Sequence, residues 1–490
     1  MTDSSTRGLA SSELVELAEP LAPGPLVNAD IAPTPPGQRT WNLWHIASLW
    51  VGMSVCIPTY MLAASMINAG LSWRLSLFAI LAGNVIVLVP MVINAHAGTR
   101  YGIPFPVYSR AAFGVAGAHV PALLRAVVAC GWFGIQTWIG GLAIHAFAGI
   151  LWPGWLALGG DWRFMGYGLP HYVSFLAFWT VNIYFVWRGT ESIKWLETLA
   201  APVLIGLGLA LLAWAAARVG GIGPMLAGAD RLSRPASGSQ GHSMVGILIP
   251  WVTAMVGYWA TLSLNIPDFT RFARSQRDQA VGQALGLLTT MPLFAFVGIA
   301  VTSATVVIYG EAIWNPVDLL ARVAAESGNA ALGLLALGAI AVATLTTNIA
   351  ANVVAPAISI ANLNPQRISF QLGGLMAGVV GILIFPWKLL DVYQGWLITY
   401  SGLLGAVGGV LVCDYALVRR GVLRLADLYR EQGAYTYRGG VNPHAMAALA
   451  AGVAVALAGL AHPAVRFLFD GAWFSAAIVS FGLYWILMKR

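Results

Sequence analysis

Long apolar runs, separated by short stretches rich in glycine, proline and charge, recur along the chain from Leu43 to Met488. An α-helix needs about 20 residues to cross ~30 Å of hydrocarbon, so apolar runs of this length are typical of transmembrane helices. The pattern predicts twelve such helices, over residues 44–70, 73–97, 121–151, 171–188, 195–217, 244–268, 281–309, 331–360, 369–386, 393–418, 442–461 and 466–488.

Two of the predicted helices contain helix-breaking residues. The first carries Gly52 and then Pro58 at mid-membrane depth, and the sixth carries Gly257 in its middle and Pro267 near its end. Irregular backbone inside a membrane is tolerated only where protein covers it or where it lines a cavity. Both helices are therefore predicted to be interrupted at corresponding places in two five-helix halves, with a solute site near the midplane.

The segments outside the apolar runs also carry expectations. Residues 1–40 are rich in Pro, Ser, Ala and acidic groups and lack the basic start of a secretory signal, so they are expected to form a mobile cytoplasmic tail. Residues 98–106 hold several helix breakers and are interpreted as a structured inner loop. Asn315 is expected to begin a short outer helix, and residues 419–441, with five arginines, a cytoplasmic connection.

Composition agrees with this interpretation. Hydrophobic residues make up 58% of the 490 positions and charged residues 9%, against about 25% charged in soluble domains. The chain is interpreted as an integral membrane protein with one continuous membrane domain. The three cysteines, Cys56, Cys130 and Cys413, lie in apolar runs without metal-ligand spacing, so neither a disulfide framework nor a metal cluster is expected.

The net charge of +7 reflects orientation rather than a nucleic-acid partner. Arg and Lys gather at the ends of the predicted helices, and most of them lie on one predicted side. The positive-inside rule then places both termini in the cytoplasm. The predicted outer loop, residues 218–243, runs against the rule because it contains Arg218, Arg231 and Arg234.

Polar residues inside two apolar runs identify candidate chemistry. Trp132 and Gln136 are four residues apart in one run, and Asn348 and Asn352 are four apart in another. Residues at this spacing share a face of a helix. Because polar groups within a membrane are costly, such faces indicate the lining of a solute site. The chain has no phosphate-binding glycine loop, no paired carboxylates at the membrane centre and no His/Cys cluster, so an enzyme is not expected.

Over nearly its whole length the chain resembles nucleobase-cation symport family 1, whose members transport hydantoins, allantoin and nucleobases. The most specific motifs are Gly131 to Trp138, Asn265 to Phe272, Ala343 to Asn352, and Asp414-Tyr415 followed by Val418-Arg419-Arg420. The resemblance implies an all-α fold of twelve transmembrane helices, a leucine-transporter-type inverted repeat plus two helices, that works by alternating access. The repeats would cover residues 41–217 and 244–418, and the two further helices residues 442–490.

The resemblance also implies roles for individual residues. Trp132 would stack on a flat substrate ring, Gln136 and Asn352 would hydrogen-bond its amide edge, and Trp259 would close against it. A side-chain amide both donates and accepts, which suits rings with alternating N–H and C=O groups.

Two positions at this site depart from the family pattern and are expected to affect the choice of ring. Cys56 stands where relatives place Gln, Asn or Gly, and Tyr258 stands where the hydantoin transporter has Gly.

A sodium site is implied by the same resemblance. Its ligands would be the backbone carbonyls of Gly52, Val55 and Ala343 and the hydroxyls of Thr346 and Thr347. Oxygen ligands suit a hard cation, and an interrupted helix supplies free carbonyls. Proton coupling stays open as an alternative, since some relatives lack a hydroxyl there.

Simpler interpretations compete at several positions. Asn348 can join helices rather than bind solute, and threonines in helices often bond to the preceding turn. Asp268 and Arg271 are interpreted as an inner gate or structural pair, and His145 as a hydrogen-bonded structural residue. Trp138 and Trp162 are assigned to packing and to the membrane interface.

The resulting hypothesis is a bacterial inner-membrane symporter. It would import a nucleobase such as uracil, or a cyclic ureide such as allantoin or hydantoin, with sodium as the coupling ion and no other cofactor. Its partners would be a small planar heterocycle and membrane lipid, and no nucleic acid. Three alternatives stay open: proton coupling, a substrate-sensing receptor with little transport, and a channel.

Overall fold

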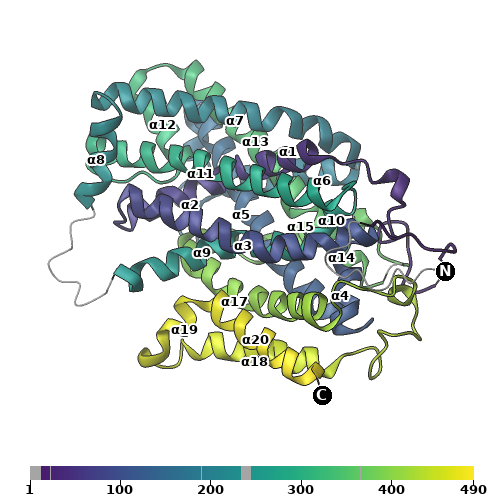
Figure 1. Cartoon of the computed structure of the whole chain (residues 1–490). Coiled ribbons are helices and arrows are strands. Elements are labelled where there is room, and N and C mark those ends of the chain that lie inside the picture. The colour runs from purple at the N-terminus through teal and green to yellow at the C-terminus, as the bar shows by residue number, and fades with distance from the viewer. Residues whose placement is uncertain (1–12, 22–23, 189, 233–243, 365, 490) are drawn as a thin grey trace.

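The computed structural model describes residues 13–21, 24–188, 190–232, 244–364 and 366–489, and helices dominate these residues. The helices lie side by side in an elongated bundle (Figure 1). The helices are α1 (Leu43–Ser54), α2 (Ile57–Asn68), α3 (Trp73–Tyr101), α4 (Phe105–Phe113), α5 (His119–Leu151), α6 (Leu169–Arg188), α7 (Thr190–Val219), α8 (Ile222–Leu232), α9 (Met244–Asn265), α10 (Pro267–Thr270), α11 (Gln276–Tyr309), α12 (Pro316–Ser327), α13 (Ala330–Asn352), α14 (Val354–Ala361), α15 (Phe370–Leu383), α16 (Pro386–Asp391), α17 (Tyr393–Val412), α18 (Pro443–Ala458), α19 (Arg466–Asp470) and α20 (Ala472–Lys489).

Other regular structure in the described residues is minor. A π-helical turn, η4 (Cys413–Val418), extends α17, and a small hairpin pairs β1 (Arg163–Phe164) with β2 (Tyr167–Gly168). Short 3₁₀ turns are η2 (Pro36–Gln38), η3 (Pro153–Ala157), η5 (Ala426–Tyr429) and η6 (Pro463–Val465).

The helices coincide with the predicted spans. Nine helices in the described residues are long and apolar enough to cross a membrane, α1 and α2 form one bent pair, and α15 and α18 are shorter apolar helices. Large apolar side chains such as Leu293, Leu335 and Ile478 lie exposed on the outside of the bundle, where lipid would cover them. The all-helical membrane class is confirmed, whereas the division into two five-helix repeats stays a prediction.

The first span is interrupted, as predicted. The axes of α1 and α2 meet at 55°. The Cys56 N–H donates to the Ser54 carbonyl and the Thr59 N–H to the Cys56 carbonyl, at 3.1 Å in both cases. In a regular helix these two N–H groups would bond Gly52 and Val55. At the break, the carbonyls of Gly52 and Val55 therefore lose the N–H donors that they would have in a regular helix.

The predicted interruption of the sixth span at Gly257 is wrong. Helix α9 runs unbroken through Gly257 to Asn265, and the irregular residue is Ile266, just before Pro267. Gly257 serves packing instead, because a Cβ there would lie 2.7 Å from the Leu397 carbonyl oxygen of α17. A glycine inside an apolar run thus marked a close helix contact rather than a break.

The inner loop predicted over residues 98–106 is also partly wrong. Helix α3 continues through Gly98 to Tyr101, and only three residues separate it from α4. A Cβ at Gly98 would lie 2.7 Å from the Pro267 Cα, so this glycine too allows close packing. The turn itself uses Gly102, whose φ of 69° favours glycine.

Two other predicted connections can be compared with the structure. Within the predicted outer loop, residues 222–232 form α8, and residues 233–243 lie outside the described residues. The helix predicted to begin at Asn315 is confirmed, because Asn315 Oδ1 caps α12 by accepting from the Val317 N–H at 3.0 Å.

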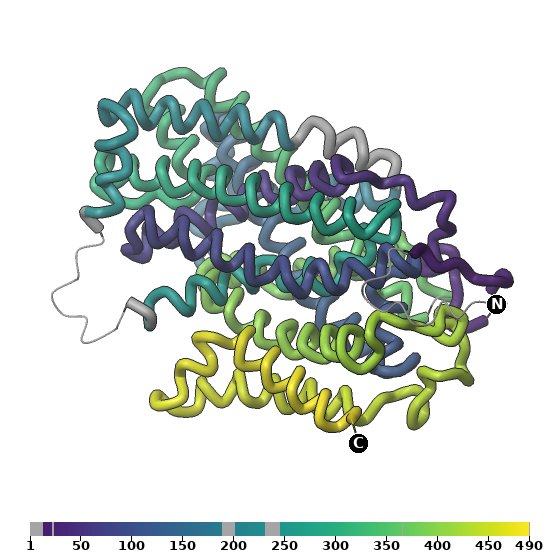
Figure 2. Tube along the Cα trace, viewed as in Figure 1, coloured from purple at the N-terminus to yellow at the C-terminus, as the bar shows by residue number. Residues whose placement is uncertain are grey.

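Described residues of the N-terminal region do not form a mobile tail. Residues 24–41, here called the N-terminal strap, cross one end of the bundle beside the connection 419–441 (Figure 2). Ile31 is fully buried, and its carbonyl accepts from the Tyr429 hydroxyl at 2.7 Å. Arg110 and Arg271 donate to the carbonyls of Leu26 and Asp30. The tail prediction is wrong here because buried arginines bind the strap's backbone, while residues 1–12 lie outside the described residues.

Arg39 anchors the strap. Its guanidinium donates to four backbone carbonyls, those of Val15, Thr34, Thr99 and Arg100, at 2.8 to 3.1 Å. Burial lowers the pKa of Arg39 to about 10, which is still far above neutral. The side chain therefore keeps its charge and needs these oxygens.

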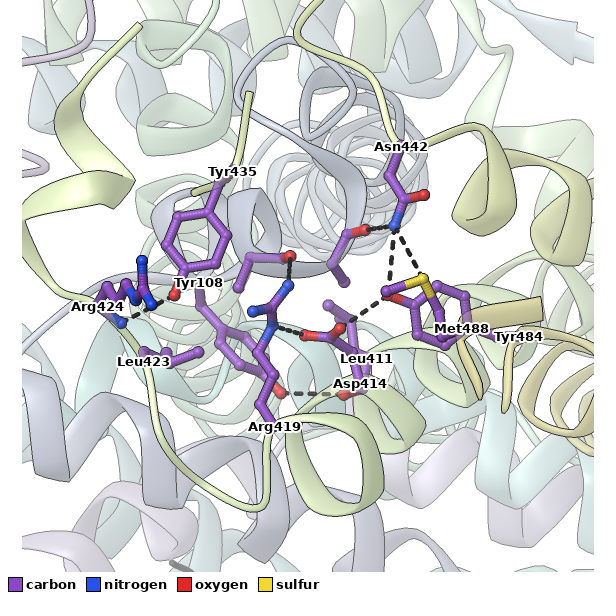
Figure 3. A network of polar contacts seen from close by, with 12 residues as sticks. Tyr108, Leu411, Asp414, Arg419, Leu423, Arg424, Tyr435, Asn442, Tyr484 and Met488 are labelled. Atoms are coloured by element: carbon purple, nitrogen blue, oxygen red, sulfur yellow. Dashed lines mark hydrogen bonds and ion pairs between the residues drawn. The ribbon is translucent and has the colours of Figure 1, made fainter. Parts of the chain in front are cut away.

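The C-terminal helices are fixed to the bundle by a buried polar network at the same end (Figure 3). Asp414 in η4 accepts from Arg419 Nε and from the Tyr484 hydroxyl, both at 2.7 Å. Arg419 Nη2 also donates to the Ala111 carbonyl of α4 at 2.7 Å. The motif around Asp414 thus joins α4, η4 and α20, and the connection 419–441 packs around it.

Candidate functional site

One cavity in the described residues lies where the break between α1 and α2 meets α5, α9 and α13. Its space is about 30 Å³. It contains all six residues predicted to contact a ring, and five that the sequence did not single out for this role. The lining residues are Met53, Cys56, Trp132, Gln136, Tyr258, Trp259, Thr261, Leu262, Thr347, Ala351 and Asn352.

The cavity is too narrow for a ring. Ligand sites usually enclose about 300 to 1,000 Å³, far more than this space. Trp132 and Gln136 are 5% and 4% exposed. A planar ring can therefore enter only after the lining side chains move apart.

Helix α17 holds Trp132 in place, which the sequence analysis missed. The Trp132 indole N–H donates to the Tyr400 hydroxyl at 3.1 Å, and that hydroxyl donates to the Gly257 carbonyl at 2.8 Å. The rings of Trp396 and Tyr393 meet the Trp132 ring edge-on, at centroid distances of 5.0 and 6.0 Å. These α17 residues follow helical spacing, the one clue the sequence offered.

Trp259 is held by residues of α11 and α1. Its indole N–H contacts the sulfur of Met291 at 2.9 Å, and its ring packs edge-on against Trp50 and Tyr258 at 5.1 and 4.8 Å. Tyr258 in turn meets the Trp132 ring edge-on at 5.0 Å. Trp132, Tyr258 and Trp259 therefore form one continuous aromatic wall of the cavity.

The two side-chain amides predicted to bind the ring, Gln136 and Asn352, differ in their hydrogen bonds within the protein. Gln136 Oε1 is buried and has no hydrogen-bond partner within the protein. An unpaired acceptor in an apolar interior costs about 1 to 3 kcal/mol, so it is available to a ligand N–H. Asn352 is tied to its own helix, because its Nδ2 donates to Asn348 Oδ1 at 3.0 Å.

The two residues that depart from the family pattern contact each other. Cys56 Sγ lies 3.2 Å from the Tyr258 hydroxyl, and Thr59 Oγ1 lies 3.0 Å from the same oxygen. Thr59 and Cys56 are themselves 3.2 Å apart, which closes a triangle. The two departures thus form one unit, with Thr59 as a member that the sequence analysis missed.

The residues predicted to bind sodium supply oxygen donors only. The hydroxyls of Thr346 and Thr347 both donate to the Ala343 carbonyl, at 2.8 and 3.1 Å. A hydroxyl that donates keeps lone pairs for a cation, whereas the Ala343 oxygen already accepts two bonds. Together with the backbone carbonyls of Gly52 and Val55, whose helical N–H donors bond elsewhere, these oxygens would suit a hard cation, with Ala343 as the weakest member of the set. No group of three His, Cys, Asp or Glu side chains in the described residues could hold a metal ion.

Asp268 and Arg271 bind different partners rather than each other. The Asp268 carboxylate accepts from the Phe105 N–H at 2.8 Å and from Asn265 Nδ2 at 3.2 Å, while Arg271 donates to the strap. Asn265 also accepts from the fully buried Arg125 at 3.0 Å. This cluster, including Arg125, ties the end of α9 to α5 and α4.

The remaining singled-out residues have structural surroundings. His145 accepts from the Trp155 indole at 3.0 Å and stacks on His171 at 4.0 Å, as expected of a structural residue. Trp138 is buried among aromatic rings, and Trp162 is exposed. Asn348 joins α13 to α5 and α6, in agreement with helix joining rather than direct contact with the cavity.

Comparison with known proteins places this geometry in a family. A family model described as permease for cytosine/purines, uracil, thiamine and allantoin matches residues 33–481. The chain is 42% identical to the purine-uracil permease NCS1 of Arabidopsis thaliana, over 95% of this chain and 78% of that protein. It is 39% identical to the allantoin permease of Bacillus subtilis, over 95% and 93% of the two chains.

Solved structures of the transporter Mhp1 share the fold. Its inward-facing conformation has a TM-score of 0.76 at 26% identity and covers 96% of this chain and 95% of Mhp1. Its closed conformation, a nucleobase-cation-symport-1 transporter with bromovinylhydantoin bound, has a TM-score of 0.73 at 27% identity and covers 95% of both chains. The chain therefore belongs to the nucleobase-cation-symport-1 family and is a multi-pass membrane transport protein, not an enzyme.

Proposed function

We propose that the protein imports a nucleobase such as uracil, or a related cyclic ureide such as allantoin or hydantoin, by cation symport with sodium. Relatives named as purine-uracil and allantoin permeases support this range of rings, as does the hydantoin bound to Mhp1. We place the protein in a bacterial inner membrane. The distribution of Arg and Lys favours an orientation with both termini in the cytoplasm.

One observation carries the proposal: Gln136, whose Oε1 is unpaired, lines the same narrow cavity as Trp132 and Asn352. Ureide rings are flat and carry alternating N–H and C=O groups. Such a ring offers a π-face to Trp132 and an N–H to Gln136. Stacking contributes about 1 to 3 kcal/mol per base in single-strand nucleic-acid binders and tolerates many rings.

Sodium is proposed as the coupling ion because the donor set at the α1–α2 break consists of oxygens. Gly52, Val55, Thr346 and Thr347 would hold the ion, with Ala343 completing the set. An inward-moving cation contributes about 2.3 kcal/mol per 100 mV of membrane potential, enough to accumulate solute. Proton coupling would need a group that takes up the proton, and no carboxylate lines the cavity. Sodium is therefore the proposed ion, and proton coupling is the alternative that the experiments test.

A thermal-shift panel tests ring and ion together. Purified protein is heated with uracil, cytosine, adenine, allantoin or hydantoin, in sodium or in choline. Stabilisation by a uracil- or ureide-type ring only in sodium supports the proposal. Stabilisation indifferent to sodium overturns sodium coupling, and no stabilisation by any ring overturns the substrate class.

Uptake into proteoliposomes tests transport itself. Sodium-gradient-driven, saturable accumulation is expected, and it separates a symporter from a channel and from a receptor that only binds. Trp132→Ala should abolish accumulation, whereas Trp162→Ala, which changes an exposed tryptophan outside the cavity, should leave it intact. Normal uptake by Trp132→Ala would remove the site assignment.

A further inference from the structure

A chain of side-chain amides leads from the cavity into the protein. Asn352 Nδ2 donates to Asn348 Oδ1 at 3.0 Å, and Asn348 Nδ2 donates to Asn182 Oδ1 at 3.1 Å. Asn182 Nδ2 then donates to the Phe178 carbonyl at 2.8 Å. The relay, here Asn182, Asn348 and Asn352, starts on α6, crosses to α13 and ends at the cavity.

Backbone carbonyls fix the direction of this relay. An amide side chain can exchange its donor and acceptor by rotating, but a backbone carbonyl can only accept. Because Asn182 must turn its NH₂ group to the Phe178 carbonyl, its oxygen faces Asn348. Asn348 must then donate to Asn182, which leaves its own oxygen for Asn352.

A second carbonyl fixes the same direction independently. The Thr137 hydroxyl donates its proton to the Phe133 carbonyl at 2.6 Å, so toward Asn348 it can only accept. Asn348 Nδ2 lies 3.0 Å from that hydroxyl and 3.3 Å from the Phe133 carbonyl. Three acceptors thus surround the Asn348 NH₂ group, and rotating the Asn348 amide would set oxygen against oxygen at each of them.

Burial prevents water from relaxing this arrangement. Asn182, Asn348 and Thr137 are fully buried, and Asn352 lines the cavity. Inside a membrane protein no solvent is at hand to pair a reversed amide. Asn352 therefore keeps its NH₂ group on Asn348, and its carbonyl oxygen is the atom left for a ligand.

We propose that Asn182 and Asn348 are positioning residues that set the hydrogen-bond polarity of the cavity through Asn352. The inference rests on the proposed function and narrows its substrate class. A ring is accepted when it brings an N–H donor to Asn352, as uracil does with N3–H. Cytosine has nearly the same shape but carries an unprotonated acceptor nitrogen at that place, so it is rejected by two facing acceptors.

The test measures a ratio of affinities. Equilibrium binding of uracil and of cytosine to the purified full-length protein in sodium is compared between wild type, Asn348→Leu and the control Asn84→Leu. Asn84 is equally buried, lies on α3, and makes no hydrogen bond to the relay. Wild type and the control are expected to prefer uracil, and Asn348→Leu should lower the preference roughly 10-fold, because Asn352 then loses the acceptor that holds its NH₂ group and can rotate to offer that group to cytosine.

A merely structural role for Asn348 would weaken the binding of both rings by the same factor and leave the ratio unchanged, and this result overturns the inference. Asn182→Leu and the isosteric Thr137→Val each remove one of the three acceptors around Asn348 and should lower the ratio by smaller factors, which keeps the test decisive if Asn348→Leu does not fold. Wild type that prefers cytosine also overturns the inference. Wild type that binds neither ring overturns the proposed function itself, and the inference with it.

Discussion

Gln136 in the cavity at the centre of the bundle differs in its hydrogen bonding from two charged residues at the strap end, Arg39 and Asp414. At the centre, Gln136 Oε1 has no partner in the protein. At the end, Arg39 has four carbonyl partners, and both Asp414 oxygens are paired. Both regions are buried, so the difference is not one of solvent.

The difference distinguishes a group that binds a ligand from groups that stabilise the fold. A group that must accept a passing ring cannot be saturated by the protein, and its desolvation costs stability until a ligand arrives. A group that only holds segments together contributes most when every bond is made. Replacing the unpaired Gln136 amide and replacing a fully paired group such as Asp414 should therefore change the free energy of unfolding in opposite directions.

The largest effect is expected at Asp414. Asp414→Ala leaves Arg419 without its carboxylate in a largely buried position, and breaking such a pair costs about 3 to 5 kcal/mol. Thermal unfolding in detergent measures the loss. The matched control Asp391→Ala breaks the exposed pair with Lys388 and should cost about 0 to 1 kcal/mol. Equal losses in the two variants would contradict the supporting role of this network.

Arg39→Ala should come next. It removes one side chain that bonds four carbonyls; a hydrogen bond to a charged group contributes about 1.5 to 3 kcal/mol net, and four bonds from one group are not additive. A drop of about 3 kcal/mol in unfolding free energy is expected, together with proteolysis within the N-terminal strap. Arg163→Ala is the control, since that arginine also donates to two carbonyls but lies exposed. An unaltered protease pattern in Arg39→Ala would show that the strap is held by other contacts.

Gln136→Leu should have the opposite sign. Replacing an unpaired buried acceptor by an apolar group of similar size should raise stability by about 1 kcal/mol, while ring binding is lost. Thermal unfolding without ligand and binding of uracil or allantoin give the two numbers. A destabilised variant would mean that the Gln136 amide supports the fold and that the contrast between the two regions is wrong.

Tyr258→Phe should give the smallest change. It removes the hydroxyl from the triangle with Cys56 and Thr59, at a cost of about 1 kcal/mol or less for one net hydrogen bond. Ring preference should shift more than stability does, because the tyrosine lines the cavity. Thermal unfolding and the ring panel together check this. A stability loss as large as that of Arg39→Ala would place the triangle with the supporting groups.

Hydropathy predicted the membrane-spanning helices because a helix that crosses the bilayer needs about 20 consecutive, mostly apolar residues, and this property is local in the sequence. The break in the first span was predictable for a similar reason, since Pro58 removes a helical donor within its own turn. Helical spacing also predicted that Trp132 shares a face with Gln136. These inferences need only neighbours along the chain.

Glycines were the main source of error. Gly257 and Gly98 were interpreted as breakers, but each lies against the backbone of another helix. The local sequence pattern cannot distinguish a glycine that breaks a helix from one that allows close helix packing, because the residue packed against the glycine lies far along the chain. The N-terminal strap was misjudged for the same reason: its composition is that of a free tail, and its order comes from arginines on distant segments.

The sequence by itself thus determined the membrane-spanning helices, the broken first helix and the polar faces on α5 and α13, all of which follow from period and composition. Only the tertiary structure decided that α17 holds Trp132, that Asn182 on α6 stands behind Asn352, and that the strap is bound. A hydrogen bond needs its partner within about 3 Å, and which residues come that close is settled by how helices pack, not by their order along the chain.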